Sequence, residues 1–224
     1  MTNIIELNVK EKVYKNKKNK KAAMSVLKDF KLEVKSGETI AIVGKSGAGK
    51  TSLLNILGLL DRNYNGSYSL FGSKTSEYNL NQLAEWRNRK IGFVLQESAL
   101  IDSISIEDNI RLPLLYASPD RKDFSEELES IAEKIGIKHI LKKKPLECSG
   151  GEKARAVFAR AVIMRPPLIL CDEPTASLDG ENKENILSLL SRMNKEYNTT
   201  VITVTHDMEV AERHQRIIKL EREM

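Results

Sequence analysis

Four short runs of apolar and β-branched residues stand out along the chain, each bounded by polar or turn-forming residues. They are too short and too rich in β-branched side chains to be helices, so they predict buried strands. The four runs are Thr39–Val43, Ile91–Leu95, Leu168–Cys171 and Val201–Thr205. A further strand-like run, Arg216–Leu220, lies near the carboxyl end.

Helical patterns lie between these runs. The apolar residues of Glu181–Glu196 recur at the spacing of one helix face, at Ile186, Leu189, Leu190 and Met193. Further helices are expected over Thr51–Leu60, Gln82–Arg89 and Ser125–Ile135. Strands that alternate with helices predict an α/β fold, in which a parallel sheet is covered on both faces.

The middle third of the chain, from about residue 98 to 165, reads as mostly helical and charged. Because it lies between two predicted core strands, we expect an insertion into the sheet domain rather than a separate unit. A length of 224 residues, 41% hydrophobic and 30% charged, is typical of one soluble globular domain. No apolar run approaches the roughly 18 residues of a membrane-spanning helix, so a partner would have to hold this protein at a membrane.

Cysteine and charge add little to this picture. Cys148 and Cys171 lack the spacing of a metal or redox motif, which predicts two reduced thiols in a cytosolic protein. Part of the net charge of +5 is concentrated in the lysines of Lys15–Lys21. Such a cluster can contact nucleic acid or lipid headgroups, but we favour a solvated turn between two strands.

The strongest chemical signal is a glycine-rich phosphate loop that directly follows the first predicted strand and directly precedes a helix. Its glycines let successive backbone N–H groups turn inward around an anion, and the helix adds the positive end of its dipole. In this pattern Lys50 reaches the β- and γ-phosphates, and the Thr51 hydroxyl is offered to Mg²⁺. The predicted phosphate-binding residues are Gly44, Lys45, Ser46, Gly47, Ala48, Gly49, Lys50, Thr51 and Ser52.

Two further segments carry candidate chemistry. The strand before Pro174 ends in Asp172 and Glu173, at the edge of a sheet where ligands bind. We expect Asp172 to hold magnesium and Glu173 to orient or deprotonate the attacking water. About a hundred residues after the phosphate loop in sequence, Ser149 precedes two glycines and a helical pattern, so it can cap a helix whose first N–H groups are exposed.

Together these motifs resemble, in order and over nearly the whole chain, the nucleotide-binding domain of ABC transporters. The matching positions are Tyr14, the phosphate loop, Gln96, Ser149-Gly150-Gly151, Asp172-Glu173, Ser177-Leu178-Asp179 and His206. The resemblance implies a P-loop NTPase core with a mostly parallel sheet, an N-terminal antiparallel β subdomain and an inserted helical subdomain at about 97–165. It also implies a single domain over residues 1–224, with ATP and Mg²⁺ as ligands.

The resemblance assigns roles to single residues. Tyr14 stacks on adenine, Gln96 touches the magnesium with Thr51 and Asp172, and His206 contacts the γ-phosphate. Lys50, Glu173 and His206 are then the catalytic residues. The resemblance also implies an ATP-dependent homodimer, in which the signature of one subunit closes over ATP bound to the other and Asp179 communicates between subunits. The signature residues are Ser149, Gly150, Gly151 and Glu152.

Two positions depart from the family pattern. The signature usually opens with leucine and closes with glutamine, whereas this chain has Cys148 and Glu152. Cysteine is a small hydrophobe and is expected to pack in place of leucine. The carboxylate of Glu152 adds negative charge near the phosphates, so we expect the closed state to depend on Lys153 and Arg155.

Three segments point to one branch of this family: Asn55–Asp61, Ile91–Gln96 and Leu112–Leu114. These segments are similar to the branch that serves macrolide exporters, lipoprotein release, cell-division regulation and bacteriocin or antimicrobial-peptide export. The implied partner is a separate transmembrane permease, contacted between Gln96 and Ile101–Tyr116. A separate permease is expected because the chain stops soon after its last strand-like run. The implied location is peripheral, on the cytoplasmic face of the plasma membrane.

Two alternatives stay open from the residues. A soluble ABC-type ATPase acting on DNA or ribosomes shares the motifs. However, such proteins usually carry a long coiled coil or two cassettes, so no nucleic acid partner is expected. A plain P-loop kinase would have no use for Ser149–Gly151 or His206.

Overall fold

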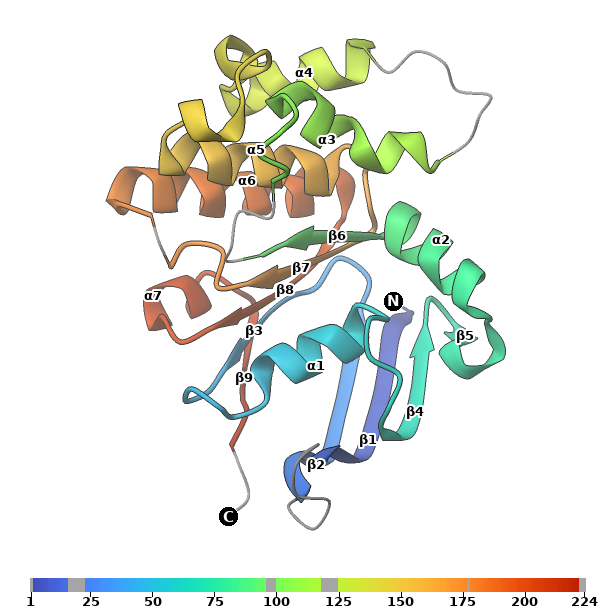
Figure 1. Cartoon of the computed structure of the whole chain (residues 1–224). Coiled ribbons are helices and arrows are strands. Elements are labelled where there is room, and N and C mark those ends of the chain that lie inside the picture. The colour runs from blue at the N-terminus through green and yellow to red at the C-terminus, as the bar shows by residue number, and fades with distance from the viewer. Residues whose placement is uncertain (1, 16–22, 96–99, 118–124, 177, 222–224) are drawn as a thin grey trace.

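The computed structural model describes residues 2–15, 23–95, 100–117, 125–176 and 178–221. Five parallel strands form one sheet in the order β6-β7-β8-β3-β9 (Figure 1). They are β3 (Thr39–Val43), β6 (Ile91–Val94), β7 (Leu168–Asp172), β8 (Thr200–Thr205) and β9 (Arg216–Lys219). The predicted strands and the parallel sheet are therefore confirmed, with bounds that differ by one residue at most.

A second, antiparallel sheet has the strand order β2-β1-β4-β5. Its strands are β1 (Asn3–Lys15), β2 (Ala23–Lys35), β4 (Asn65–Leu70) and β5 (Ser73–Lys74). The β1–β2 register shifts where Lys12 pairs with Leu27 but Val13 pairs with Ser25, so that Val26 is an extra residue in β2. Of the lysine cluster, Lys15 ends β1 and the others lie outside the described residues.

Seven α-helices are described: α1 (Lys50–Leu57), α2 (Leu80–Lys90), α3 (Ile106–Leu115), α4 (Ser125–Ile135), α5 (Gly150–Val162), α6 (Gly180–Tyr197) and α7 (Met208–Ala211). Short 3₁₀ turns occupy Thr75–Glu77, Lys138–Ile140 and Pro145–Glu147. Helices α3, α4 and α5 gather at one end of the molecule, whereas α1 lies with the antiparallel sheet on the other side of the parallel sheet (Figure 1). No helix within the described ranges combines the length and apolar character needed to span a membrane.

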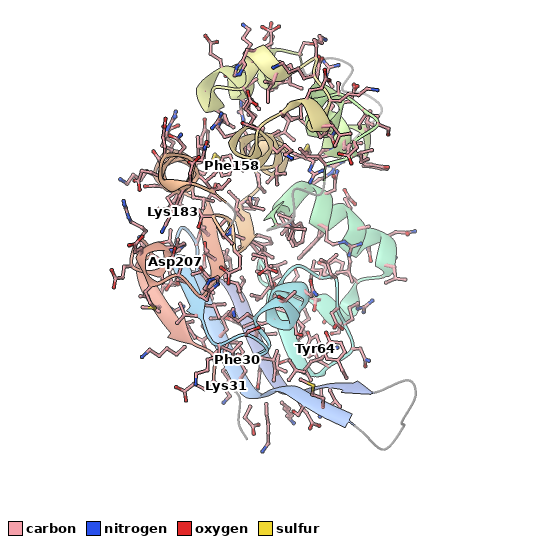
Figure 2. All side chains as sticks on the ribbon, turned by 60° about the vertical axis from the view of Figure 1, so that its left-hand side comes forward. Phe30, Lys31, Tyr64, Phe158, Lys183 and Asp207 are labelled. Atoms are coloured by element: carbon pink, nitrogen blue, oxygen red, sulfur yellow. The ribbon has the colours of Figure 1, made fainter. Side chains whose placement is uncertain are left out.

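The parallel sheet is covered on both faces, as its alternating side chains require. In β7, Leu168 and Leu170 pack in a core with α1 and the antiparallel sheet. The intervening Ile169 and Cys171 pack in a second core with α3 to α6, which includes the buried Phe158 (Figure 2). Strand β7 thus joins the two cores, and its carboxyl end emerges between them.

Two expected helix bounds were wrong. Helix α1 ends at Leu57 rather than Leu60, where Gly58 forms the C-cap and Leu59 takes a left-handed conformation. Helix α2 begins earlier than expected because Asn79 and Gln82 form a reciprocal capping box.

The expected apolar face of α6 is confirmed. Leu189 is half-buried and packs against the same core as the buried Ile186, Leu190 and Met193. Leu187 is buried as well, because this helix packs against both α5 and β8.

Candidate functional site

The phosphate loop connects β3 to α1 and leaves the start of that helix open. Gly49 is the N-cap with φ of 95°, and no side chain caps the helix. Gly47 also has a left-handed φ, of 79°. A Cβ atom on Gly49 would lie 2.7 Å from the carbonyl oxygen of Val26, the extra residue of β2. The loop therefore presents uncapped N–H groups in a backbone that favours glycine, as an anion site requires.

Two side chains of α1 reach the mouth of this loop. Lys50 Nζ donates to the carbonyl oxygens of Gly44, at 2.8 Å, and Lys45, at 3.3 Å. The Thr51 hydroxyl donates to Asp172 Oδ2 at 3.3 Å. The structure thus brings the start of α1 to the carboxyl end of β7, the arrangement that the two sequence motifs predict.

The donor set at this junction fits a hard divalent cation. Burial raises the pKa of Asp172, and the negative charge of Glu173 adds to the effect. A cation beside the carboxylate and the Thr51 hydroxyl would offset both contributions. Magnesium is usually held by one or two carboxylates together with substrate phosphates, so these oxygen donors suffice.

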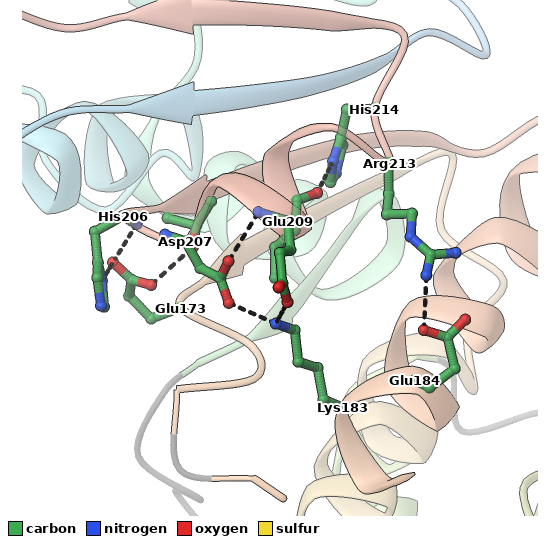
Figure 3. Close-up of polar contacts among 10 residues, drawn as sticks. Glu173, Lys183, Glu184, His206, Asp207, Glu209, Arg213 and His214 are labelled. Carbon is green, nitrogen blue, oxygen red and sulfur yellow. Dashed lines mark hydrogen bonds and ion pairs between the residues drawn. The ribbon is translucent and has the colours of Figure 1, made fainter. Parts of the chain in front are cut away.

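Glu173 is held in one position beside this junction (Figure 3). Its φ is 46°, a left-handed value that is costly for a residue other than glycine. Thr205 Oγ1 donates to Oε2 at 3.0 Å. The backbone N–H of His206 donates to Oε1 at 3.0 Å, and His206 Nδ1 lies 2.7 Å from the same oxygen. Both carboxylate oxygens therefore have partners at the carboxyl end of β8 and in the residue that follows it.

The loop that carries His206 is itself tied to α6. Lys183 Nζ lies 2.7 Å from both Asp207 Oδ2 and Glu209 Oε2 (Figures 2 and 3). The Asp207 N–H donates to Thr205 Oγ1 at 3.0 Å. A chain of contacts therefore runs from α6 to Glu173, although the His206 side chain itself remains 70% exposed.

Tyr14 lies at the same end of α1. Its hydroxyl is 3.3 Å from Ser52 Oγ and 3.3 Å from Asp61 Oδ2, and 45% of the residue is exposed. The predicted aromatic and the predicted Ser52 are therefore neighbours of the phosphate loop, although β1 and α1 are distant in sequence.

The second glycine motif begins α5 with a closed cap. Ser149 Oγ accepts from Glu152 N at 3.2 Å, and Glu152 Oε2 accepts from Ser149 N at 2.7 Å. His139 Nε2 lies 3.0 Å from Glu152 Oε1. The bond from the Ser149 N–H, together with His139, lowers the pKa of Glu152 to about 2. The carboxylate that departs from the family pattern is therefore an ionised member of the capping box.

Next to this cap, α5 packs against α6. A Cβ atom on Gly151 would lie 2.1 Å from Asn182 Oδ1, whereas one on Gly150 would meet open space. Asp179 caps α6 by accepting from Asn182 N at 2.9 Å. Arg155 donates to Asn182 Oδ1 at 2.7 Å, so this arginine contacts α6 and it is His139 that faces Glu152. Cys148 is buried and both cysteines are free, as expected.

The two glycine motifs do not form one site within the chain. Helix α1 packs in the core on one face of the parallel sheet, whereas α5 packs in the core on the other. Among the described residues, the hollow of about 500 Å³ beside the phosphate loop is lined by Val43–Ala48 and Lys219–Glu221, not by the signature. Gln96 and Ser177 lie outside the described residues.

Sequence reasoning missed three residues that support the site. Lys12 is buried and pairs with Asp61 at 2.6 Å, beneath Tyr14. Thr205 is buried and bonded to Glu173. A lysine two residues before Tyr14 on the same strand is a signal for the first pair, because side chains two apart share a face of the strand.

Comparisons with known proteins agree with this geometry. The family model described as ABC transporter matches residues 27–176. The bacitracin export ATP-binding protein BceA of Halalkalibacterium halodurans is 39% identical over 215 residues, which cover 96% of this chain and 84% of that one. The lipoprotein-releasing system ATP-binding protein LolD of Idiomarina loihiensis is 37% identical over 194 residues, covering 87% and 85%.

A solved structure has the same fold. The ATP-binding cassette MJ0796, described as a dimer in a post-hydrolysis state bound to ADP and phosphate, superposes with a TM-score of 0.88 and 34% identity. The match covers 97% of this chain and 94% of that chain.

Proposed function

The chain belongs to the ABC transporter family and hydrolyses ATP, and from this premise we propose that it powers export by a separate membrane permease. The ATP-dependent part of the proposal is carried by the junction of an uncapped phosphate loop with Thr51, Asp172 and Glu173, and the export part is supported by the similarity to the bacitracin export ATP-binding protein. We further propose one ATP-binding domain over residues 1–224, with an inserted helical subdomain at about 97–165. Its location would be peripheral, on the cytoplasmic face of the membrane.

In the proposed reaction, this chain's residues bind and orient the nucleotide. The loop amides and Lys50 hold the β- and γ-phosphates, and Tyr14 stacks on the base. Thr51 and Asp172, together with Gln96, would hold Mg²⁺, which when bound offsets charge on the phosphate oxygens. Glu173 accepts a proton as the water oxygen bonds to the γ-phosphorus and the bond to the bridging oxygen breaks, while His206 donates to the γ-phosphate.

The second half of each site would come from another copy. The α5 start lies on the opposite face of the sheet from α1, and the solved relative MJ0796 is a dimer. In an isologous pair, the Gly150 amide, the Ser149 hydroxyl and the capped Glu152 of one subunit would close over the nucleotide of the other. Asp179, which caps α6 beside Gly151, would carry the state of that interface to Lys183 and hence to the His206 loop.

A groove beside the edge strand β6 is the proposed permease contact. It encloses about 690 Å³ between α2, β6 and α3, and its lining includes the exposed Leu60, Leu95 and Tyr116. This position overlaps the contact region expected from the sequence, around Ile101–Tyr116. Exposed apolar side chains around a groove favour a helical segment of a partner.

The permease contact has a direct test. Tyr116→Asp is expected to abolish co-purification with the membrane protein encoded by an adjacent reading frame. Leu146→Asp is the matched control, because both residues are 79% exposed. Equal retention of the permease by both variants would contradict the groove assignment.

The catalytic assignment is tested with Glu173→Gln. If Glu173 accepts the proton from water, the variant binds Mg-ATP but turns it over at least roughly 100-fold more slowly, and it accumulates as a dimer in size-exclusion chromatography with light scattering. Glu133→Gln, an exposed change on α4, serves as the control. A Glu173→Gln variant that stays monomeric at saturating Mg-ATP would contradict both the assignment and the dimer.

A further inference from the structure

Lys12 is a buried lysine outside the phosphate loop, and three groups surround its ammonium. The residue is 1% exposed. Its Nζ lies 2.6 Å from Asp61 Oδ2, donates to the carbonyl oxygen of Asn63 at 2.7 Å, and sits 4.6 Å from the centroid of the Tyr14 ring. One cation therefore joins β1 to the connection between α1 and β4 and also lies over an aromatic ring.

Stability alone is a weak reason for this arrangement. Desolvating a lysine and a carboxylate costs about as much as their attraction returns, and apolar residues of similar volume usually serve a core as well. Although burial alone would raise the pKa of Asp61, the bonds from Lys12 and Asn63 lower it overall, which favours the ionised carboxylate. A retained buried ion pair often fixes one geometry, and here the geometry it fixes is that of Tyr14.

The hydroxyl of Tyr14 is held by the same cluster. It lies 3.3 Å from Asp61 Oδ2 and 3.3 Å from Ser52 Oγ, and Ser52 directly follows Thr51 of the phosphate loop. Lys12 and Tyr14 are two residues apart on β1, so their side chains share a face of the strand. The ring is thus fixed at its hydroxyl and over the Lys12 ammonium, yet 45% of the residue remains exposed beside the phosphate loop.

We propose that Lys12 and Asp61 are positioning residues that hold the Tyr14 ring where the base of a bound nucleotide stacks. The proposal rests on the proposed function, because it takes the phosphates to lie in the loop at the start of α1. The cation–π contact and the hydroxyl bonds restrict the ring before the ligand arrives, so that less order is lost on binding. The pair therefore acts on the base and not on the phosphates.

A ligand without a base separates this role from a structural one. Isothermal titration calorimetry on the whole chain compares Mg-ATP with Mg-tripolyphosphate, which can fill the phosphate loop but has nothing to stack. Tyr14→Ala is expected to lower the affinity for Mg-ATP about 10-fold, the usual contribution of one base stacked on one aromatic ring. Lys12→Met is expected to lower the affinity for Mg-ATP by about 3- to 10-fold and to leave the affinity for Mg-tripolyphosphate unchanged.

Three further variants sharpen the test. Lys12→Met added to Tyr14→Ala is expected to cause no further loss, because the two changes act on the same contact. Lys12→Arg keeps the cation and is expected to retain most of the Mg-ATP affinity. Lys10→Met makes the same change at an exposed position of β1 and is expected to match the unmodified chain.

Equal losses for both ligands would overturn the proposal, because Lys12 would then brace the phosphate loop. Additive losses in the double variant, or unchanged Mg-ATP binding by Lys12→Met, would also overturn it. If Lys12→Met does not fold, Asp61→Asn removes the charged partner while keeping side-chain oxygen and nitrogen, and the same selective loss is expected. Failure of the unmodified chain to bind either ligand would instead contradict the proposed function.

Discussion

Helices α1 and α5 both begin within a glycine-containing motif, and their first turns are built in opposite ways. Helix α1 has a left-handed Gly49 as its cap and no side-chain acceptor for its N–H groups. Helix α5 begins with a closed capping box, in which Ser149 and Glu152 satisfy each other's backbone N–H groups. The open start can take a triphosphate by itself, whereas the closed start can add only its hydroxyl and remaining amides to a ligand already held elsewhere.

This difference suits the two helix starts to different roles, one to binding the nucleotide and the other to closing over it. At the α1 start, the Lys50 ammonium can reach phosphates, and the Thr51 hydroxyl beside Asp172 of β7 can hold a magnesium ion. At the α5 start, the charge is a glutamate that caps its own helix. Binding and closing over the nucleotide should therefore be separable. Substitutions at the two helix starts test that separation.

Lys50→Ala should have the largest effect. The ammonium now rests on loop carbonyls and would transfer to the phosphates, so its loss removes an electrostatic donor worth about 3–4 kcal/mol in the transition state. Phosphate-release assays should show a fall in kcat/KM of several hundred-fold or more. Lys74→Ala, on the exposed β5, is the control, and a Lys50→Ala variant with ordinary turnover would remove the basis for the α1 assignment.

Ser149→Arg should have a smaller effect and raise the activation free energy of ATP turnover by about 2–3 kcal/mol, because a bulky cation blocks the approach of the α5 start to a second chain. Mg-ATP binding to the single chain should remain unchanged in titration calorimetry. Ser188→Arg, exposed on α6, controls for the added arginine. A parallel loss of binding and turnover would show that the two helix starts are not separable.

Acidification should distinguish the carboxylates of the two regions. Glu152 has its pKa lowered from 4.5 to about 2, so its stabilisation is present above pH 4.5 and is lost as the pH falls toward 2. Burial raises the pKa of Asp172 above 3.8, so the native state takes up that proton first and gains stability on acidification. The free energy of unfolding, measured with urea between pH 6 and 2.5, should therefore fall less steeply in Glu152→Gln, by about 1 kcal/mol, and more steeply in Asp172→Asn, than in the unmodified chain. The same slope in both variants would contradict these opposite shifts.

Glu152→Gln should have the smallest effect on function. Glutamine can still accept the Ser149 N–H, so the cap is kept while a negative charge near the phosphates is removed. The ATP-dependent dimer should tighten by about 0.5–1 kcal/mol, measured by sedimentation in Mg-ATP. Glu133→Gln makes the same charge change on α4, and a weaker dimer for Glu152→Gln alone would show that the carboxylate helps closure.

The sequence predicted the parts of the site that depend on local chemistry. Strand β3, the phosphate loop and the two acids at the carboxyl end of β7 follow from short patterns with a strict residue order. Contacts that depend on tertiary packing were not predictable in the same way. The approach of Gly49 to Val26 depends on an extra residue in the β1–β2 pairing, and the burial of Leu187 depends on α6 packing on two elements at once.

Ionic partners were the least predictable. The expected dependence of the closed state on Lys153 and Arg155 concerns the pair of chains and stays a prediction. Within the single chain, His139 reaches Glu152 from a preceding turn and Arg155 faces Asn182, and neither contact was foreseen. Lys153 directly follows Glu152 and so points to another side of the helix, whereas Arg155 is three residues on and could reach Glu152 but bonds to Asn182 of α6 instead, a tertiary contact that the local pattern does not predict.

The central claim is that each complete site takes its α1 start from one chain and its α5 start from another. It can be tested by mixing Lys50→Ala with Ser149→Arg, each expected to be inactive by itself. Random pairing would make about half of the dimers mixed, and each mixed dimer would hold one site with both starts intact. The account predicts that ATP turnover returns on mixing, to as much as about a quarter of the unmodified rate. A mixture as inactive as its separate components, under conditions where mixed dimers are shown to form, would contradict it.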